Sequence, residues 1–391
     1  MRNSLALVPL TEPELRTRRS LKWSRAGSGL VPADVAEADF AVAGPIREAL
    51  VTAVTRSDLG YPDFDSPRGG PRRLAEVFAD RMRSRFNVPA DPGRVQVCAQ
   101  IMQALCCVIL AFSEPGDRVL AHEPTYPPIL RAIERLNRRP VVVPVAHEDN
   151  DEILDSVALP AERIALIVLC NPHNPTGRLF GVGQLAALAA LADRHGSVIF
   201  ADEVHHDMTY ETSHRSIAAL DGAAERTIVF TSAAKSFNIP GLRCAVGHFG
   251  SSALLRRFQE LPWHLRSGAG TLGIEATIAA WSACELWLDA FRRQLYHNRE
   301  LVSDAILACG CGYTPPEATY FAWIDLRGTA AHSDPVGYLS KEKKVIRQDG
   351  TVFGQGYSGF ARLNFAVPES RLSDVLSRVV QVLPSIGFGR R

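Results

Sequence analysis

The chain has 391 residues, of which 46% are hydrophobic and 22% are charged, a composition typical of a globular protein with two or three lobes. Its 43 basic and 42 acidic residues nearly balance, giving a formal net charge of +1. This balance excludes the strongly basic surface expected of a protein that binds nucleic acid or an anionic membrane.

The eight cysteines lack the spacing of a disulfide framework, and we interpret them as reduced. Cys309 and Cys311 flank a glycine, but no second pair follows at zinc-like spacing, so no metal site is predicted. The apolar stretch Leu5–Leu10 is too short for a signal peptide, and no segment reaches transmembrane length. We therefore expect a cytoplasmic protein.

The N-terminal half begins with an irregular stretch rich in charge and turn residues, which we expect to form an arm laid on a larger body. A helical pattern starts at Pro45, and a loop dense in glycine and proline covers Gly60–Gly70. Pro71 opens an amphipathic helix, and Ile101–Phe112 is an apolar helix.

The middle of the chain alternates short apolar strands with helices. Because these strands have no polar face, the pattern predicts a mostly parallel sheet covered on both sides, with ligands beyond the carboxyl ends of its strands. The predicted strands are 118–121, 140–145, 164–169, 198–201 and 227–230, and the predicted helices are 127–136 and 184–194, the latter closed by Gly196.

After about residue 285 the pattern changes to that of a smaller α+β domain. A long helix over 287–306 precedes strands at 320–325 and 360–365 and a last helix from Ser370. The predicted division of the chain is an arm over 1–44, a large domain over 45–285 and a small domain over 286–391.

Lys235 is the most distinctive candidate for chemistry. It follows the strand 227–230, and we expect it in a loop just beyond that strand's carboxyl end. Ser232 and Arg243 on either side offer a hydroxyl and a fixed cation, which suit a phosphate. An amine beside a bound phosphate indicates pyridoxal 5′-phosphate (PLP) held as a Schiff base on Lys235.

Two neighbouring strands also end in polar residues. One runs into Asn171–Gly177 and the next into Asp202–His206. Asp202 can hold a protonated pyridine nitrogen, and Asn174 can donate a hydrogen bond to a phenolate oxygen.

These segments, together with Arg362–Phe365, resemble fold-type I PLP enzymes of the class I/II aminotransferase superfamily, and the resemblance covers nearly the whole chain. Five details resemble its cystathionine β-lyase-like, or C–S lyase, branch. They are Lys22-Trp23, Ala38–Phe40, Asn171–Pro175, Asp202–His205 and Ala318–Trp323.

The resemblance implies a role for each site residue. Lys235 binds the cofactor and moves the Cα proton. Arg362 binds the substrate carboxylate, and Asn174 and Tyr126 also lie near the substrate. Tyr61 reaches the phosphate of the other subunit's site, which implies a homodimer. The cofactor contacts are Tyr61, Gln100 and Ile101 at a helix start, Tyr126 on the ring face, Asn174, Asp202, His205, Ser232, Lys235 and Arg243.

Gln100 departs from the superfamily pattern, because relatives commonly place a glycine in this phosphate loop. Its side chain either crowds the site or adds a hydrogen bond to substrate, so the departure bears on substrate identity more than on cofactor binding.

Rival functions rest on weaker patterns. Gly181–Ala186 matches a loose dinucleotide fingerprint, but Gly177 intervenes between it and the preceding strand. His195, His205, His206 and Asp207 could indicate a metal, but we interpret them as a helix-end histidine, a cofactor-side His205 and solvent-facing neighbours. No Gly-x-Ser-x-Gly elbow of a hydrolase is present.

The predicted function is β-elimination on a cysteine S-conjugate, giving a thiol, pyruvate and ammonia. The alternatives are an aminotransferase, a decarboxylating or deaminating PLP enzyme of natural-product biosynthesis such as antibiotic formation, and a non-catalytic PLP-binding interaction module.

Overall fold

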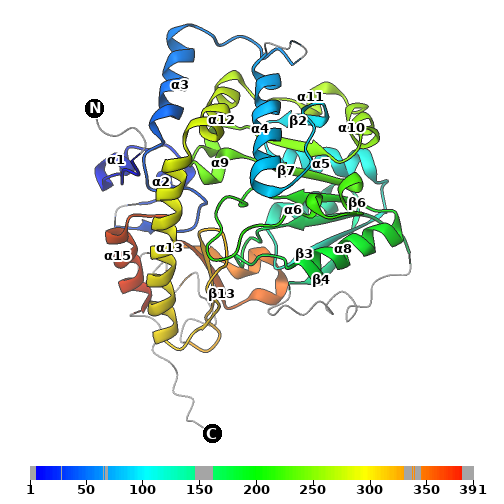
Figure 1. Cartoon of the computed structure of the whole chain (residues 1–391). Helices are drawn as coiled ribbons and strands as arrows, with labels where there is room; N and C mark the ends of the chain where they lie inside the picture. The colour runs from blue at the N-terminus through cyan, green and yellow to red at the C-terminus, as the bar shows by residue number, and fades with distance from the viewer. Residues whose placement is uncertain are drawn as a thin grey trace.

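A computed structural model describes residues 6–27, 29–64, 66, 69–145, 162–329, 337, 339 and 345–380. Within these residues, a seven-stranded sheet, a four-stranded antiparallel sheet and a two-stranded ribbon are surrounded by helices (Figure 1). The large sheet has the order β2-β8-β7-β6-β5-β3-β4. These strands are β2 (Val95–Cys98), β3 (Arg118–Glu123), β4 (Arg139–Pro144), β5 (Ile164–Cys170), β6 (Val198–Asp202), β7 (Thr227–Thr231) and β8 (Ala245–Phe249).

The parallel core of this sheet forms as predicted, because its strands are apolar on both faces. β5 and β7 are buried along their whole length. Ile167 and Leu169 contribute to one apolar cluster, whereas Leu166 and Val168 contribute to another, so alternate residues face opposite sides of the sheet. β2 and β8 are not among the predicted strands, and β8 runs antiparallel to both β7 and β2.

Helices cover both faces of the large sheet. The apolar cluster that holds Val168 includes residues of α5 and α6, and the one that holds Ile167 includes residues of α4, α8, α12 and α13. Gly196 ends α8 with a φ of 63°, as the sequence predicted. The helices are α3 (Gly44–Thr55), α4 (Gly70–Phe86), α5 (Ile101–Phe112), α6 (Pro127–Arg135), α8 (Val182–His195), α9 (Ala233–Ser236), α10 (Ser252–Gln259), α11 (Trp263–Arg266), α12 (Thr271–Ala283), α13 (Glu285–Ala308) and α15 (Glu369–Val380).

The C-terminal part contains the smaller sheet, with the order β12-β13-β10-β9, and the helices α13 and α15 pack together beside it (Figure 1). Its strands are β9 (Gly312–Tyr313), β10 (Phe321–Asp325), β12 (Gln348–Asp349) and β13 (Phe360–Asn364). The predicted strands and long helix of this part are therefore present, while the exact domain boundaries stay a prediction.

The N-terminal segment is more regular than the expected irregular arm. It contains the short helices α1 (Glu12–Arg16) and α2 (Leu21–Ser24), and β1 (Val31–Pro32) pairs in parallel with β11 (Val345–Ile346). Local capping contributes to α1, because the Glu14 carboxylate accepts hydrogen bonds from the backbone N–H and the hydroxyl of Thr11 at 2.8 and 2.7 Å.

The eight cysteines are all free, and six of them are buried. In the part of the chain that the structure describes, no helix combines the length and the apolar character needed to cross a membrane.

Candidate active site

The three polar strand ends predicted to meet are neighbours in the large sheet. β5, β6 and β7 pair in parallel in that order, and Cys170 lies opposite Asp202, which in turn lies opposite Phe230. The loops that follow these strands therefore leave the same edge of the sheet, as predicted.

Lys235 lies in a single helical turn, α9, and the prediction that it lies in a loop is wrong. The Ser232 hydroxyl caps this turn by accepting a hydrogen bond from the backbone N–H of Ala234 at 3.1 Å. The amine of Lys235 donates to the carbonyl oxygen of Ala36 at 3.4 Å. Burial of this amine, reinforced by the charge of Arg362, lowers the pKa of Lys235 to about 8, so an uncharged fraction exists near neutral pH.

Asp202 is the carboxylate of this edge and is 7% exposed. Its Oδ1 accepts a hydrogen bond from the backbone N–H of Val204 at 3.1 Å. Burial raises the pKa of Asp202 to about 6, an effect that the charge of Lys235 opposes. A cationic N–H placed against this carboxylate would lower its pKa again and stabilise its ionised form.

Arg362 reaches the same place from β13, and it is buried without an anionic partner. Its Nη1 donates to Asn174 Oδ1 at 2.7 Å, its Nη2 donates to the Asp34 carbonyl at 2.9 Å, and it also contacts the Gln348 side chain. All three acceptors are neutral, and Arg362 forms no ion pair with a carboxylate of the described residues, although the Asp34 carboxylate acts on it at longer range. Burial lowers the pKa of Arg362 to about 10, as expected for a desolvated cation.

His205 and Tyr126 border the same region. His205 is 2% exposed, and its ring lies edge-on to Tyr320 and Phe321 with centroids 5.9 and 5.6 Å away. Burial lowers the pKa of His205 far enough that the ring is neutral. Burial raises the pKa of the Tyr126 hydroxyl, on which the charges of Asp202 and Arg362 also act.

The predicted phosphate-binding residues also converge. Arg243 adopts a left-handed φ of 53°, and its guanidinium donates to the Gln100 side chain. Gln100 occupies the N-cap position of α5 without a capping side-chain hydrogen bond, and the helix begins at Ile101, so its first backbone N–H groups lie near Arg243. The Ser232 hydroxyl donates to the Cys244 carbonyl at 2.5 Å and must rotate to meet a phosphate.

Tyr61 is the predicted site residue that the single chain does not bring to the others. Its side chain is 101% exposed in the loop between α3 and α4. Conversely, no sequence pattern indicated that Ala36 and Tyr320 belong to the site. The Tyr320 hydroxyl donates to the Ala36 carbonyl at 3.2 Å, and only the three-dimensional fold places residue 36 beside Lys235.

The residues of the rival patterns have structural contacts of their own. No group of three metal-ligating side chains occurs among the residues described, and Gly181 serves as the cap of α8. His206 is buried, not solvent-facing as expected, because its ring stacks on Phe86 at 4.1 Å. Asp207 is buried too, and it pairs with Arg81.

The donor set fits PLP. Asp202 matches a protonated pyridine nitrogen, and the amide nitrogen of Asn174 stays available for a phenolate oxygen because Arg362 occupies the amide oxygen. Arg243 and the start of α5 match a phosphate, and Lys235 supplies the amine.

A family model described as aminotransferase class I and II matches residues 42–379. The chain belongs to this family. It is 30% identical over 371 residues to cystathionine beta-lyase of Corynebacterium glutamicum, covering 95% of this chain and 98% of the relative. Cystathionine beta-lyase PatB of Bacillus subtilis is 28% identical over 381 residues, covering 93% and 97%.

Solved structures agree with this assignment. A crystallised Corynebacterium diphtheriae protein, named provisionally as a PLP-dependent beta-cystathionase, superposes with a TM-score of 0.87 at 29% identity, covering 97% of this chain and 99% of that one. The predicted superfamily, fold-type I architecture, enzyme class and PLP cofactor are confirmed.

Replacing Asp202 by asparagine is expected to have opposite effects on the apo and PLP-bound forms. Because the folded state raises the pKa of Asp202 to about 6, ionisation at neutral pH destabilises the folded apoprotein. Asp202→Asn should therefore stabilise the apoprotein by roughly 1–3 kcal/mol at pH 7. The gain should vanish below about pH 4, where the carboxyl is protonated in both the folded and unfolded states.

In the PLP-bound form the same variant should be less stable than the wild type, because asparagine cannot balance a protonated ring nitrogen. Thermal unfolding of both forms at pH 4 and pH 7 shows whether the substitution stabilises or destabilises each of them. An apo variant that is less stable than the wild type at pH 7 would contradict the raised pKa of Asp202, and a PLP-bound variant as stable as the wild type would contradict the proposed pairing.

Proposed function

We propose that this protein is a PLP-dependent lyase that cleaves the C–S bond of a cysteine S-conjugate by β-elimination. The observation that carries the proposal is the buried guanidinium of Arg362, which has only neutral partners among the described residues. An α-amino acid offers the carboxylate that this cation lacks, and bidentate pairing would orient its Cα. The relatives named cystathionine beta-lyase support the choice of a C–S bond.

The side chains divide the chemistry among them. PLP, when bound, supplies a cationic ring that accepts the electron pair released at Cα. Asp202 keeps the ring nitrogen protonated, while Arg362 and Asn174 hold the substrate. Lys235, with a pKa lowered to about 8, takes the Cα proton as a general base. Neutral His205 borders the ring without adding charge.

The overall reaction balances with one water molecule. The Cα–H and Cβ–S bonds break, the sulfur leaves as a thiolate that takes up a proton, and hydrolysis of the remaining three-carbon unit gives pyruvate and ammonia. A thiolate is a good leaving group, so the β-substituent decides between elimination and return of the proton.

Transamination is the second candidate, because the family itself is named for it and the same lysine can move the proton to the cofactor carbon instead. The two reactions differ in their products. Elimination yields a free thiol and ammonia without any 2-oxo acid cosubstrate, whereas transamination requires one.

The first prediction of this proposal concerns products. Purified protein loaded with PLP should release pyruvate, ammonia and thiol in equal amounts from cysteine conjugates when no 2-oxo acid is added. Lys235→Ala should lower the rate by about 10³-fold or more, because the general base is lost. Products that appear only with a 2-oxo acid would favour transamination, carbon dioxide release would indicate decarboxylation, and an unchanged cofactor spectrum with every conjugate would indicate a binding module.

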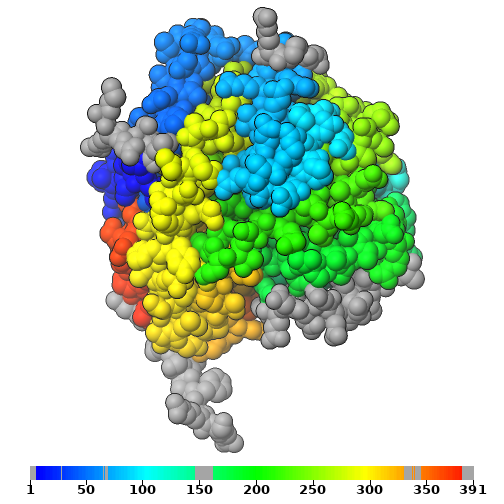
Figure 2. Space-filling view, in the orientation of Figure 1, coloured from blue at the N-terminus to red at the C-terminus, as the bar shows by residue number. Residues whose placement is uncertain are grey.

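We also infer a homodimer. Tyr61 is fully exposed, and nearby Val51, Val54 and Leu59 are 58%, 54% and 55% exposed. Figure 2 shows the α3 region projecting from the body of the molecule. Apolar side chains gathered on a projecting element favour a protein partner, and a second copy would receive Tyr61 at its phosphate site. The free cysteines favour a cytoplasmic location.

Subunit complementation tests the shared site. A Tyr61→Ala chain mixed with a Lys235→Ala chain should recover roughly a quarter of wild-type activity, since half of the dimers are hybrids with one intact site. Subunit exchange is verified by native mass spectrometry. No recovery after full exchange would show that each site is built from one chain.

Gln100→Gly tests specificity. We expect this variant to change the ranking of kcat/KM between small and bulky S-substituents by about tenfold, while the Kd of PLP changes less. The contact of Gln100 with Arg243 defines the contrary outcome. If PLP affinity falls and the ranking stays fixed, Gln100 belongs to the phosphate site alone.

A further inference from the structure

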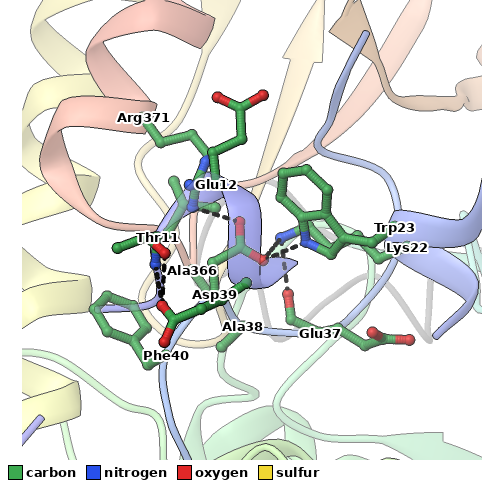
Figure 3. Close-up of polar contacts among 12 residues, drawn as sticks. Thr11, Glu12, Lys22, Trp23, Glu37, Ala38, Asp39, Phe40, Ala366 and Arg371 are labelled. Atoms are coloured by element: carbon green, nitrogen blue, oxygen red, sulfur yellow. Dashed lines mark hydrogen bonds and ion pairs between the residues drawn. The ribbon is translucent and has the colours of Figure 1, made fainter. Parts of the chain in front are cut away.

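Lys22, Trp23 and Asp39 are buried, and the proposed chemistry uses none of them. The Lys22 amine donates to Asp39 Oδ1 at 3.0 Å, and both side chains are 0% exposed. The Trp23 indole N–H donates to the same oxygen at 2.8 Å, and Arg371 of α15 pairs with Asp39 Oδ2 at 3.1 Å. Figure 3 shows these three donors converging on the Asp39 carboxylate.

Asp39 lies at one end of a segment that we call the strap, residues Asp34–Phe40. Side chains from distant elements hold its backbone carbonyls. Arg362 contacts the Asp34 carbonyl, Asn364 those of Val35 and Glu37, Lys22 that of Glu37, and Asn238 those of Ala38 and Phe40.

The centre of the strap contacts Lys235. The Ala36 carbonyl accepts hydrogen bonds from the Lys235 amine at 3.4 Å and from the Tyr320 hydroxyl at 3.2 Å. The position of this oxygen therefore limits where a free Lys235 amine can lie.

A buried ion pair is costly to desolvate, and an apolar pair of similar size often gives equal or greater stability. Fold stability alone therefore does not explain the burial of Lys22 and Asp39. We propose that the Lys22–Asp39 pair is a positioning element for the catalytic lysine, which fixes the strap so that the Ala36 carbonyl orients the amine of Lys235. Arg371 and Trp23 complete this element.

The consequence concerns the step in which the free amine bonds to the aldehyde carbon of PLP and water leaves. When the strap is disordered, the amine of Lys235 is poorly oriented, while the phosphate contacts at Arg243 and α5 stay intact. The rate of bond formation between the amine and PLP should therefore fall, and the affinity of the initial binding of PLP should not. This test needs no amino-acid substrate, so its outcome is independent of the proposed lyase reaction.

The experiment mixes full-length apoprotein with increasing PLP and follows the absorption of the lysine-bound cofactor by stopped flow. Asp39→Asn keeps the shape and the acceptor for Trp23 but removes the charge. It should slow the limiting rate at saturating PLP about tenfold or more, with an unchanged half-saturating concentration. Hydrogen exchange in the strap should be faster by a similar factor. If Asp39→Asn does not fold, Arg371→Gln, which removes one partly exposed donor, should show the same changes at smaller size.

Two comparisons separate positioning from folding. The double variant Lys22→Met/Asp39→Asn leaves no unpaired buried charge in the pair. Its Tm should therefore rise from that of Asp39→Asn toward the wild-type value, while its limiting rate stays slow. Val302→Ala in the core of α13 should lower the Tm but keep the wild-type rate. A wild-type limiting rate in both Asp39→Asn and Arg371→Gln, or recovery of rate together with Tm in the double variant, would overturn the proposal.

Discussion

The guanidinium of Arg362 is the group on which the rest of the site depends. A buried cation with only neutral partners is stable only if the surrounding fold supplies several well-placed acceptors. Here they come from Asn174 after β5, from Gln348 in β12 and from the Asp34 backbone. The large sheet, the small sheet and the N-terminal segment therefore all meet at one side chain, and the anionic substrate that we propose would complete its coordination.

Burial explains why the pKa values of Lys235 and Asp202 shift in opposite directions. Burial disfavours the charged form of each group, so the lysine loses its proton more readily and the carboxyl keeps its proton longer. A cofactor with a cationic ring nitrogen and an electrophilic carbon would remove both costs of burial. Its ring nitrogen would pair with the carboxylate, and its carbon would react with the neutral amine. The shifted pKa values of both groups therefore already favour cofactor binding in the unliganded protein.

Much of this arrangement was predictable from sequence, and the exceptions have physical causes. Fully apolar strands such as Ile164–Cys170 require a covered parallel sheet, so the meeting of Asn174, Asp202 and Lys235 follows from strand adjacency. β8 was missed because Gly247 and His248 interrupt its apolar pattern, and its strand character comes from pairing with two neighbours. The strap was missed because its carbonyls carry no sequence signal, although Lys22-Trp23 and Ala38–Phe40 were recognised as motifs.

The antiparallel direction of β8 has one further consequence. The chain leaves the sheet at the end of β7 and returns through β8, so Lys235 and Arg243 belong to one short connection between paired strands. The two groups proposed to hold the phosphate and the carbonyl carbon of PLP therefore lie on one short backbone segment. Arg362 comes from the C-terminal sheet, far along the chain. In this fold the proposed anchors of the cofactor at Lys235 and Arg243 and the proposed anchor of the substrate carboxylate are therefore supplied by separate segments.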